Sequence, residues 1–378
     1  MGVIPEDWII QLIANLVADT SPVCYGVVQV GKHSDEGIPI VAIKHVKEIE
    51  GATHHMASRA TEAPYSRSRV QAGDVLISIK GTIGRVGIVP TGFRGNISRE
   101  LDRLRIREGV CPEFVAFQLE GSSTQDRINQ AVVGTTRLEF SIAQLRNFLI
   151  ALPAVEAEQR AIAEILADID AKIKLVGRSI TKKKRLNQAA MQELLTSKRR
   201  LPGFEGEWEV KRLDAIAPLQ RGFDLPAQLL KSGPYPVVYS NGIMNHHASS
   251  QAKGPGVVTG RSGTLGKVTF VESDFWPHNT SLWVTSFKDN DPKFVFYLYD
   301  YIDFGRFASG SGVPTLNRND AHAFKVSVPQ DIDEQVAIAT VLTDLDDELM
   351  ALELKQSKTL ALKQAMMQEL LTGRIRLR

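Results

Sequence analysis

Two glycine-rich turns, each followed by a basic residue, are the stretches of this sequence best suited to binding a phosphate group. The tetrapeptide Gly-Thr-Ile-Gly at 81–84 precedes Arg85, and Gly-Thr-Leu-Gly at 263–266 precedes Lys267. Because glycine carries no Cβ atom, a phosphate can approach the backbone of such a turn closely and meet the neighbouring cation. A plain hairpin turn beside a solvated cation is the alternative interpretation.

The second of these turns is not a nucleotide-binding loop. The run from Gly260 to Lys267 is similar to the loop that cradles nucleotide phosphates, but its glycine spacing differs. In addition, Val268 stands where such a loop needs Ser or Thr to bind Mg²⁺. We therefore reject nucleotide binding at this turn.

Other polar residues in glycine-rich stretches are weaker candidates. Tyr239, Asn241 and His247 form a polar cluster that would contact a base or a phosphate, although structural histidines are common. A second set of polar residues follows glycines in the sequence, in turns just before short predicted helices. These side chains would either donate a hydrogen bond to a phosphate or cap the helix. This set consists of Thr135, Thr136, Arg137, Ser311 and Thr315.

The sequence contains no motif of a catalytic site. Neither an Asn-Pro-Pro-aromatic nor an Asp-Pro-Pro-aromatic methylation motif occurs, and helicase and metal-carboxylate nuclease patterns are missing as well. The two cysteines, Cys24 and Cys111, have no Cys or His at metal-ligand spacing. We expect a chain without catalytic residues, bound metal or cofactor.

The charge pattern restricts where a polyanion could bind. The net charge is +2, and regions 1–151 and 205–327 each hold equal numbers of acidic and basic residues. Binding would depend on the basic runs 80–107 and 182–200, although such runs are also typical of solvated faces. The apolar run 8–17 is interrupted by polar residues and lacks a basic leader, so it predicts neither a signal peptide nor a membrane span. The two cysteines, which form no disulfide framework, favour a reducing cytoplasm.

The elements that must position these residues are organised by a long internal repeat. Residues 158–201 return without a gap, 176 positions later, as residues 334–377. Both copies begin with Glu-Gln and share Leu-x-Asp-x-Asp and Met-Gln-Glu-Leu-Leu-Thr. Neither copy contains proline, so each can form one helix of about 39 residues, roughly 58 Å long.

Apolar residues at spacings of three and four give each helix one narrow apolar seam, and the two seams predict that the helices pair. Parallel pairing would place acidic residues against acidic residues, whereas antiparallel pairing brings the acidic run 344–348 to the basic run 182–185. We therefore predict an antiparallel coiled coil with approximate two-fold symmetry. Its interface residues are Ile162, Leu166, Ile169, Ile173, Val176, Ile180 and Leu194, with Ile338, Leu342, Leu345, Leu349, Leu352 and Leu370.

The regions between the repeats contain short β-rich runs separated by Gly and Pro, which predict irregular, mainly antiparallel sheet domains. The expected fold is α+β, with two globular domains that alternate with the two helices. The predicted boundaries are 1–151 for the first domain, 152–204 for the first helix, 205–327 for the second domain and 328–378 for the second helix. The domains are similar in plan but divergent in sequence.

This organisation resembles the specificity subunits of type I restriction-modification systems. The resemblance covers the whole chain and rests on the repeats, on Ala-Gly-Asp-Val-Leu-Ile-Ser at 72–78, and on Leu-Pro at 152–153 followed by Glu158-Gln159. It implies that each globular domain is a target recognition domain for one half of an asymmetric, bipartite double-stranded DNA site. It also implies two adenine-methylating modification subunits and motor-nuclease restriction subunits as partners, with S-adenosylmethionine, ATP and Mg²⁺ bound by those partners.

Phosphates would then be bound by Lys and Arg, and bases read by polar side chains from loops. A coiled-coil scaffold, a stand-alone DNA-binding protein and an enzyme with its own active site are the rival interpretations. The candidate DNA-contact residues are Lys80, Arg85, Arg94, Arg99, Arg103, Thr135, Thr136, Arg137, Tyr239, Asn241, His247, Arg261, Lys267, Asn279, Thr315 and Arg318.

Overall fold

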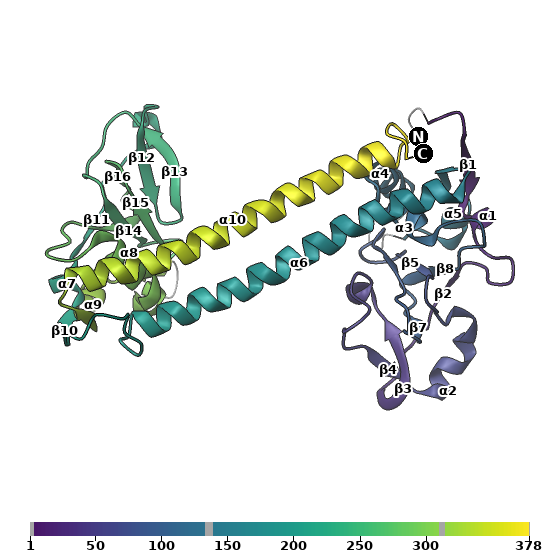
Figure 1. Ribbon diagram of the computed structural model, residues 1–378, viewed down its shortest axis with the longest axis horizontal. Coiled ribbons are helices and arrows are strands. Elements are labelled where there is room, and N and C mark those ends of the chain that lie inside the picture. Colours follow the sequence, from purple (N-terminus) through teal and green to yellow (C-terminus); the bar gives the residue numbers. More distant parts are fainter. Residues whose placement is uncertain (1–3, 133–138, 310–313, 378) are drawn as a thin grey trace. The chain divides into compact units, whose positions relative to one another are not determined.

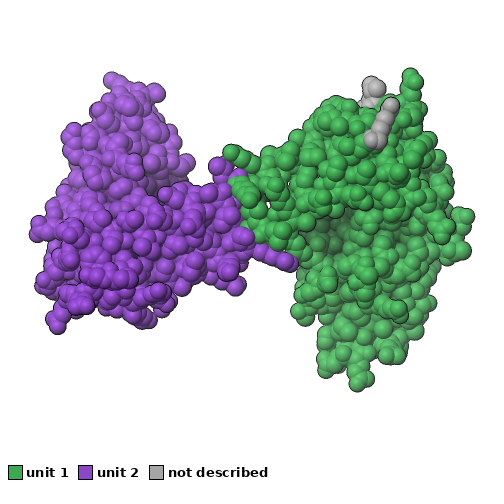
Figure 2. All heavy atoms as spheres, in the orientation of Figure 1, with its two compact units in different colours: residues 1–176, 355–378 green, residues 177–354 purple. Residues whose placement is uncertain are grey.

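The computed structural model describes residues 4–132, 139–309 and 314–377. The chain forms two compact units, Met1–Val176 with Lys355–Arg378, and Gly177–Leu354 (Figure 2). The borders of both units fall inside the two long helices, so each unit combines one globular domain with a part of each helix. Within the described ranges, no helix combines the length and the apolar character that crossing a membrane requires.

The first unit contains a four-stranded and a three-stranded sheet (Figure 1). The first has the antiparallel order β2 (Cys24–Tyr25), β8 (Leu101–Leu104), β5 (Val75–Ser78) and β6 (Val86–Ile88). The second has the order β4 (His55–Ala57), β3 (His33–Val41) and β7 (Asn96–Ile97), in which β3 and β7 are parallel. Separately, β1 (Trp8–Leu12) pairs antiparallel with β9 (Leu149–Pro153).

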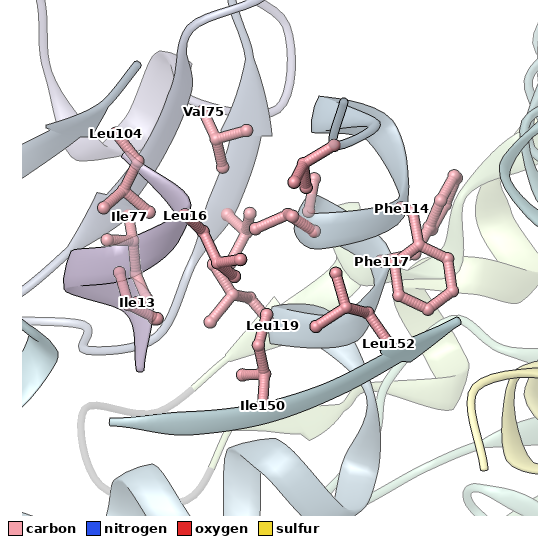
Figure 3. Packing of buried hydrophobic residues seen from close by; sticks show 14 of the residues in the cluster. Ile13, Leu16, Val75, Ile77, Leu104, Phe114, Phe117, Leu119, Ile150 and Leu152 are labelled. Carbon is pink, nitrogen blue, oxygen red and sulfur yellow. The ribbon is translucent and has the colours of Figure 1, made fainter. Parts of the chain in front are cut away.

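The helices of this domain are α1 (Ile13–Leu16), α2 (Arg59–Glu62), α3 (Pro112–Glu120), α4 (Ser122–Ala131) and α5 (Ile142–Arg146), with 3-10 turns at Ile43–His45 and Ala63–Ser68. Proline is favourable at the first position of α3 because that position needs no N–H partner. The N-cap residue of α4 is Gly121. Residues of α1, α3, β5, β8 and β9 form the apolar core shown in Figure 3.

The second unit repeats this topology. Its four-stranded sheet has the order β11 (Leu219–Arg221), β17 (Ser281–Val284), β14 (Gly256–Gly260) and β15 (Val268–Val271), and its three-stranded sheet the order β13 (Gly242–His247), β12 (Tyr235–Tyr239) and β16 (Trp276–Pro277). The strand β10 (Trp208–Arg212) pairs with β20 (Lys325–Pro329), and β18 (Ala308–Ser309) with β19 (Thr315–Leu316). The helices are α7 (Leu213–Ile216), α8 (Pro292–Ile302) and α9 (Arg318–Ala323), with 3-10 turns at Ala227–Leu229 and Phe304–Phe307.

Corresponding strands occupy corresponding places in the two domains, down to the single parallel pair in each three-stranded sheet. The expectation of mainly antiparallel sheet domains in an α+β fold is confirmed. The faint similarity in sequence therefore reflects one architecture that is built twice. Equivalent positions in the two domains can be compared through their strand registers.

The long helices are α6 (Glu156–Leu194) and α10 (Ile332–Leu370), each of 39 residues as the periodicity predicts. Within each unit they contact each other in antiparallel direction. In the first unit, Lys363 lies 2.6 Å from Asp170. In the second unit, Lys184 lies 2.8 Å from Glu353, and Asn187 donates to Asp346 at 3.1 Å. The signs of the charges thus indicated the direction of the contacts correctly.

The apolar seam does more than join the helices. Its outer residues enter the cores of the globular domains, which differs from the prediction of a helix–helix interface alone. These residues are Ile162, Leu166 and Leu370 in the first core, and Leu194, Ile338 and Leu342 in the second. The remaining ones are buried (Val176, Ile180) or half-buried (Ile169, Ile173, Leu345, Leu349, Leu352). The start of each helix is therefore anchored in one globular core and its end in the other.

The repeated glutamine at the start of each helix links the helix to its domain. Gln159 donates to the carbonyl oxygen of Pro153 at 2.8 Å and accepts from the backbone N–H of Cys111 at 2.9 Å. Gln335 makes the equivalent bonds to Pro329 and Asp291, both at 2.9 Å. One glutamine side chain thus satisfies a backbone donor and a backbone acceptor where the start of the helix is buried against its domain. This explains why both copies have glutamine at this position.

Candidate functional site

The loops at one end of the second domain's sheets bring several predicted contact residues together. The N–H of Arg261 donates to the carbonyl oxygen of Thr280 at 2.9 Å, next to Asn279. The carbonyl oxygen of Arg261 accepts from the N–H of Leu316 at 2.8 Å, next to Thr315. Loops that are distant in the sequence therefore present Arg261, Asn279 and Thr315 side by side.

The same cluster includes the last residue of strand β12 and the turn that follows it. The Tyr239 ring lies 4.2 Å from the His278 ring, measured between centroids. The exposed Lys267 donates its Nζ proton to the carbonyl oxygen of Asn241 at 2.6 Å. Gly242 has a φ of +109°, a backbone conformation that favours glycine, and a Cβ atom there would lie 3.2 Å from the lysine Nζ, a distance that a small shift of the flexible lysine side chain relieves. We call these loops, with Arg261, Asn279 and Thr315, the second-domain polar cluster.

The first domain builds the equivalent end of its sheets with different residues. The N–H of Ile79 donates to the carbonyl oxygen of Glu100 at 2.8 Å, which brings Lys80 close to Arg99. Lys80 forms an ion pair with Glu139 at 3.2 Å, and Arg99 one with Glu100 at 3.2 Å. These side chains are exposed or half-buried and form the first-domain polar cluster.

Both glycine-rich turns have the backbone geometry that their sequence indicates. They join β5 to β6 and β14 to β15, and all four glycines have φ between +71° and +82°. Arg85 is half-buried, and its N–H donates to the hydroxyl of Ser78 at 2.8 Å. The turns therefore place Arg85 and Lys267 at equivalent positions of the two domains, and Lys267 contacts the second-domain polar cluster through Asn241.

Two predicted contact residues need correction because their side chains are buried. Arg103 is 1% exposed and donates to the Ser21 hydroxyl at 2.7 Å and to the Pro22 carbonyl oxygen at 3.1 Å. His247 is 6% exposed, accepts from the N–H of Lys231 and packs against a tryptophan ring. Neither side chain belongs to the exposed surface that the polar clusters form.

The remaining candidates are not gathered with the clusters. Arg94 is exposed in the turn that precedes β7, and Arg318 is exposed at the first position of α9. Thr135, Thr136, Arg137 and Ser311 lie outside the described residues. Among the residues that are described, no group of three or more His, Cys, Asp or Glu is arranged to hold a metal ion.

The sequence did not single out Asp102, a buried carboxyl group of β8. Burial raises its pKa to about 7, with Lys80 opposing the shift and Glu139 adding to it. Neither carboxylate oxygen has a hydrogen-bond partner among the described residues. The group therefore lies close to its titration point at neutral pH. No sequence signal marks it, because the segments that bury Asp102 and the charges that act on it, Lys80 and Glu139, come from other parts of the chain.

Comparisons with known proteins agree with this architecture. A family model described as the type I restriction modification DNA specificity domain matches residues 32–185 and 205–361. The chain is 26% identical over 220 residues to the type I restriction enzyme EcoBI specificity subunit of Escherichia coli, a match that spans 57% of this chain and 45% of that subunit. It is 23% identical over 433 residues to a putative MjaX specificity subunit of Methanocaldococcus jannaschii, covering 100% of this chain and 96% of that protein.

Solved structures share the fold. The S subunit of a type I restriction-modification system from M. genitalium superposes with a TM-score of 0.70 at 16% identity, covering 98% of this chain and 97% of that one. A chain from a structural study of complex assembly and conformational transition in a type I system gives a TM-score of 0.60 at 15% identity, covering 99% and 100%. At these identities the likeness concerns the fold.

Proposed function

Since the chain belongs to the family of type I restriction-modification DNA specificity domains, we propose that it reads an asymmetric, bipartite DNA target with one half-site for each globular domain. The observation that carries the proposal is one scaffold with two different sets of polar loops. Arg85 and Lys267 are both cations at equivalent turns, whereas Arg99 of one domain corresponds to Asn279 of the other. Cations that both domains share suit phosphate contacts, which carry no sequence information. Residues that differ between the domains suit the reading of different bases.

The long helices fit the proposed assembly with two modification subunits and with restriction subunits. Several large apolar side chains on them are about half exposed. They offer apolar area to a partner's helices. These side chains are Leu186, Met350, Leu354, Leu360 and Leu362.

We expect the purified chain to transfer no methyl group and to confer sequence-specific adenine methylation when it is mixed with a cognate modification subunit and S-adenosylmethionine. Catalysis would reside in the partner, and specificity in this chain. The measurement is sequencing of methylated adenines on a plasmid library. Methyl transfer by the chain alone would contradict the proposal, as would methylation by the mixture without sequence preference.

Charge reversal at the turns, Arg85→Glu or Lys267→Glu, is expected to weaken binding of duplex DNA on all sequences alike. A phosphate contact adds affinity without reading bases, so loss of one contact should reduce the slope of log affinity against log salt by about one. Fluorescence anisotropy over a salt series measures both quantities. The matched controls are Arg59→Glu and Lys231→Glu, exposed cations elsewhere in the two domains. Unchanged affinity and slope would leave both turns as ordinary hairpins.

A further inference from the structure

A pocket of about 520 Å³ in the first domain lies between β2, β8 and the segment 66–71. Among the described residues that line it, four are arginines and none is acidic. The arginines are Arg67, Arg69, Arg103 and Arg105. An accumulation of cations in one pocket is unfavourable unless anions neutralise them, so the partner of each arginine matters.

Two of the four arginines are neutralised within the protein. Arg69 binds the buried carboxylate of Glu62 through two hydrogen bonds of 2.7 and 2.6 Å. Arg105 binds Asp74 in the same way, at 2.9 and 2.8 Å. Such paired arginines retain little attraction for a further anion.

The other two arginines have no carboxylate partner among the residues that the structure describes. Arg103 donates to neutral oxygens of Ser21 and Pro22, and its Nε–H is buried without a hydrogen-bond partner. Arg67 is exposed at the rim of the pocket, with its guanidinium 5.9 Å from the centre of the Tyr25 ring. A buried guanidinium without a counter-ion is costly, and an anion in the pocket would reduce that cost.

The neighbouring carboxyl group of Asp102 does not neutralise Arg103. Successive side chains of a strand point to opposite faces of the sheet, so the two side chains diverge. The charges that act on Asp102 are those of Lys80 and Glu139, at the polar cluster. The positive charge of Arg103 is therefore left to the pocket.

The duplicated domain shows that the fold does not need an arginine at this position. Arg103 is paired with Cys24 and Leu76 in its sheet, and the equivalent residue, paired with Gln220 and Val258, is Trp283. The tryptophan ring packs against two phenylalanine rings in the second domain. An apolar side chain fills this position there, so the buried cation is a particular feature of the first domain.

We propose that this pocket binds a phosphate group, with Arg67 at the rim and Arg103 in the wall as its cationic residues. Arg67 suits a phosphate because its exposed planar guanidinium can donate two parallel, charge-assisted hydrogen bonds, while Arg103, whose Nη atoms already donate to Ser21 and Pro22, adds positive charge from the wall. The volume exceeds that of one phosphate and accommodates a nucleotide, whose base would have the half-exposed Tyr25 ring beside it. The phosphate would come from a free nucleotide or from the DNA backbone. The site includes no residue of the glycine-rich turns and does not depend on the proposed function.

The test is isothermal titration calorimetry of the full-length chain, with inorganic phosphate and with deoxyadenosine monophosphate as the two probes. Arg67→Gln removes one of the two cations of the site, so we expect it to weaken binding of both probes at least fivefold. Because Arg67 is exposed, the substitution does not open the core. The matched control Arg59→Gln, an exposed arginine on α2 outside the pocket, should bind as the unmodified chain does. Equal affinities of the unmodified chain and Arg67→Gln, or binding too weak to detect in the unmodified chain, would overturn the proposal.

Competition with duplex DNA identifies the source of the phosphate. Displacement of the nucleotide by DNA in the unmodified chain assigns the pocket to the DNA backbone, and simultaneous binding assigns it to a free nucleotide. A chain that binds phosphate in an Arg67-dependent manner but does not bind DNA would uphold this site and reject the proposed function. A chain that binds DNA specifically but not phosphate would do the reverse.

Discussion

Replacing residues 1–151 with the corresponding domain of a relative is expected to change one half of the methylated motif completely and to leave the other half unchanged. The first domain has its own apolar core, which the start of α6 and the end of α10 complete. Gln159 of the retained helix accepts from the backbone N–H of Cys111 in the exchanged domain, and its other bond, to the carbonyl oxygen of Pro153, lies within the retained chain. A different domain can supply the same backbone N–H whatever its side chains are.

Several bonds to the retained chain require matching side chains from the incoming domain, including the two that Asp7 accepts from Arg376 at 2.6 and 2.7 Å. Gln118 of α3 donates to the carbonyl oxygens of Ala151 and Leu371, at 2.6 and 3.1 Å, so a donor domain with glutamine at this place is the best choice. The control is the reciprocal exchange of residues 205–327, which should change only the other half-site. Methylome sequencing reads both results. A motif that changed in both halves after one exchange would show that the domains do not read independently.

Arg200→Gln is expected to destabilise the second unit by about 3 kcal/mol, the largest effect on stability that we expect from a single residue. Arg200 binds Glu334 through two hydrogen bonds of 2.6 and 2.8 Å, and Glu334 is 2% exposed. Trp208 also donates to this carboxylate, at 3.3 Å. Without the arginine, a buried negative charge would remain with one weak donor.

The loss in the free energy of unfolding is measured by urea denaturation with tryptophan fluorescence as the signal. This signal reports on the second unit, because Trp208, Trp276 and Trp283 all belong to it. Arg199→Gln is the matched control, because Arg199 is 75% exposed and lies 3.8 Å from its acidic neighbour. We expect it to change stability by less than about 0.5 kcal/mol. A loss below about 1 kcal/mol for Arg200→Gln would place this pair with ordinary surface ion pairs.

Arg200 and Glu334 also show what the repeat contributes. Arg376 and Glu158 are their counterparts in the first unit, where the same two-bond pair forms at 2.6 and 2.8 Å and Asp7 binds the same arginine. The end of one helix is thus tied to the start of the other in both units. Because the partner of each residue lies in the other copy, the pairs could have been predicted from the antiparallel arrangement.

The sequence by itself determined the features that depend on local spacing. The helix lengths, the direction of the helix contacts and the two glycine-rich turns followed from it, because periodicity, charge sign and the absence of Cβ atoms act over a few neighbouring residues. The repeated topology was also visible, through the turns before Arg85 and Lys267. The family assignment followed from these features.

Only the tertiary structure decided which members of one basic run face solvent. Arg99 and Arg103 are four residues apart in the same run, yet the first is exposed and the second is buried beneath Ser21 and Pro22. That cover comes from a segment about eighty residues earlier in the chain, so neither charge nor spacing within the run could indicate it. The free energy of a charged side chain depends on what distant segments place around it, and long-range packing alone sets that environment.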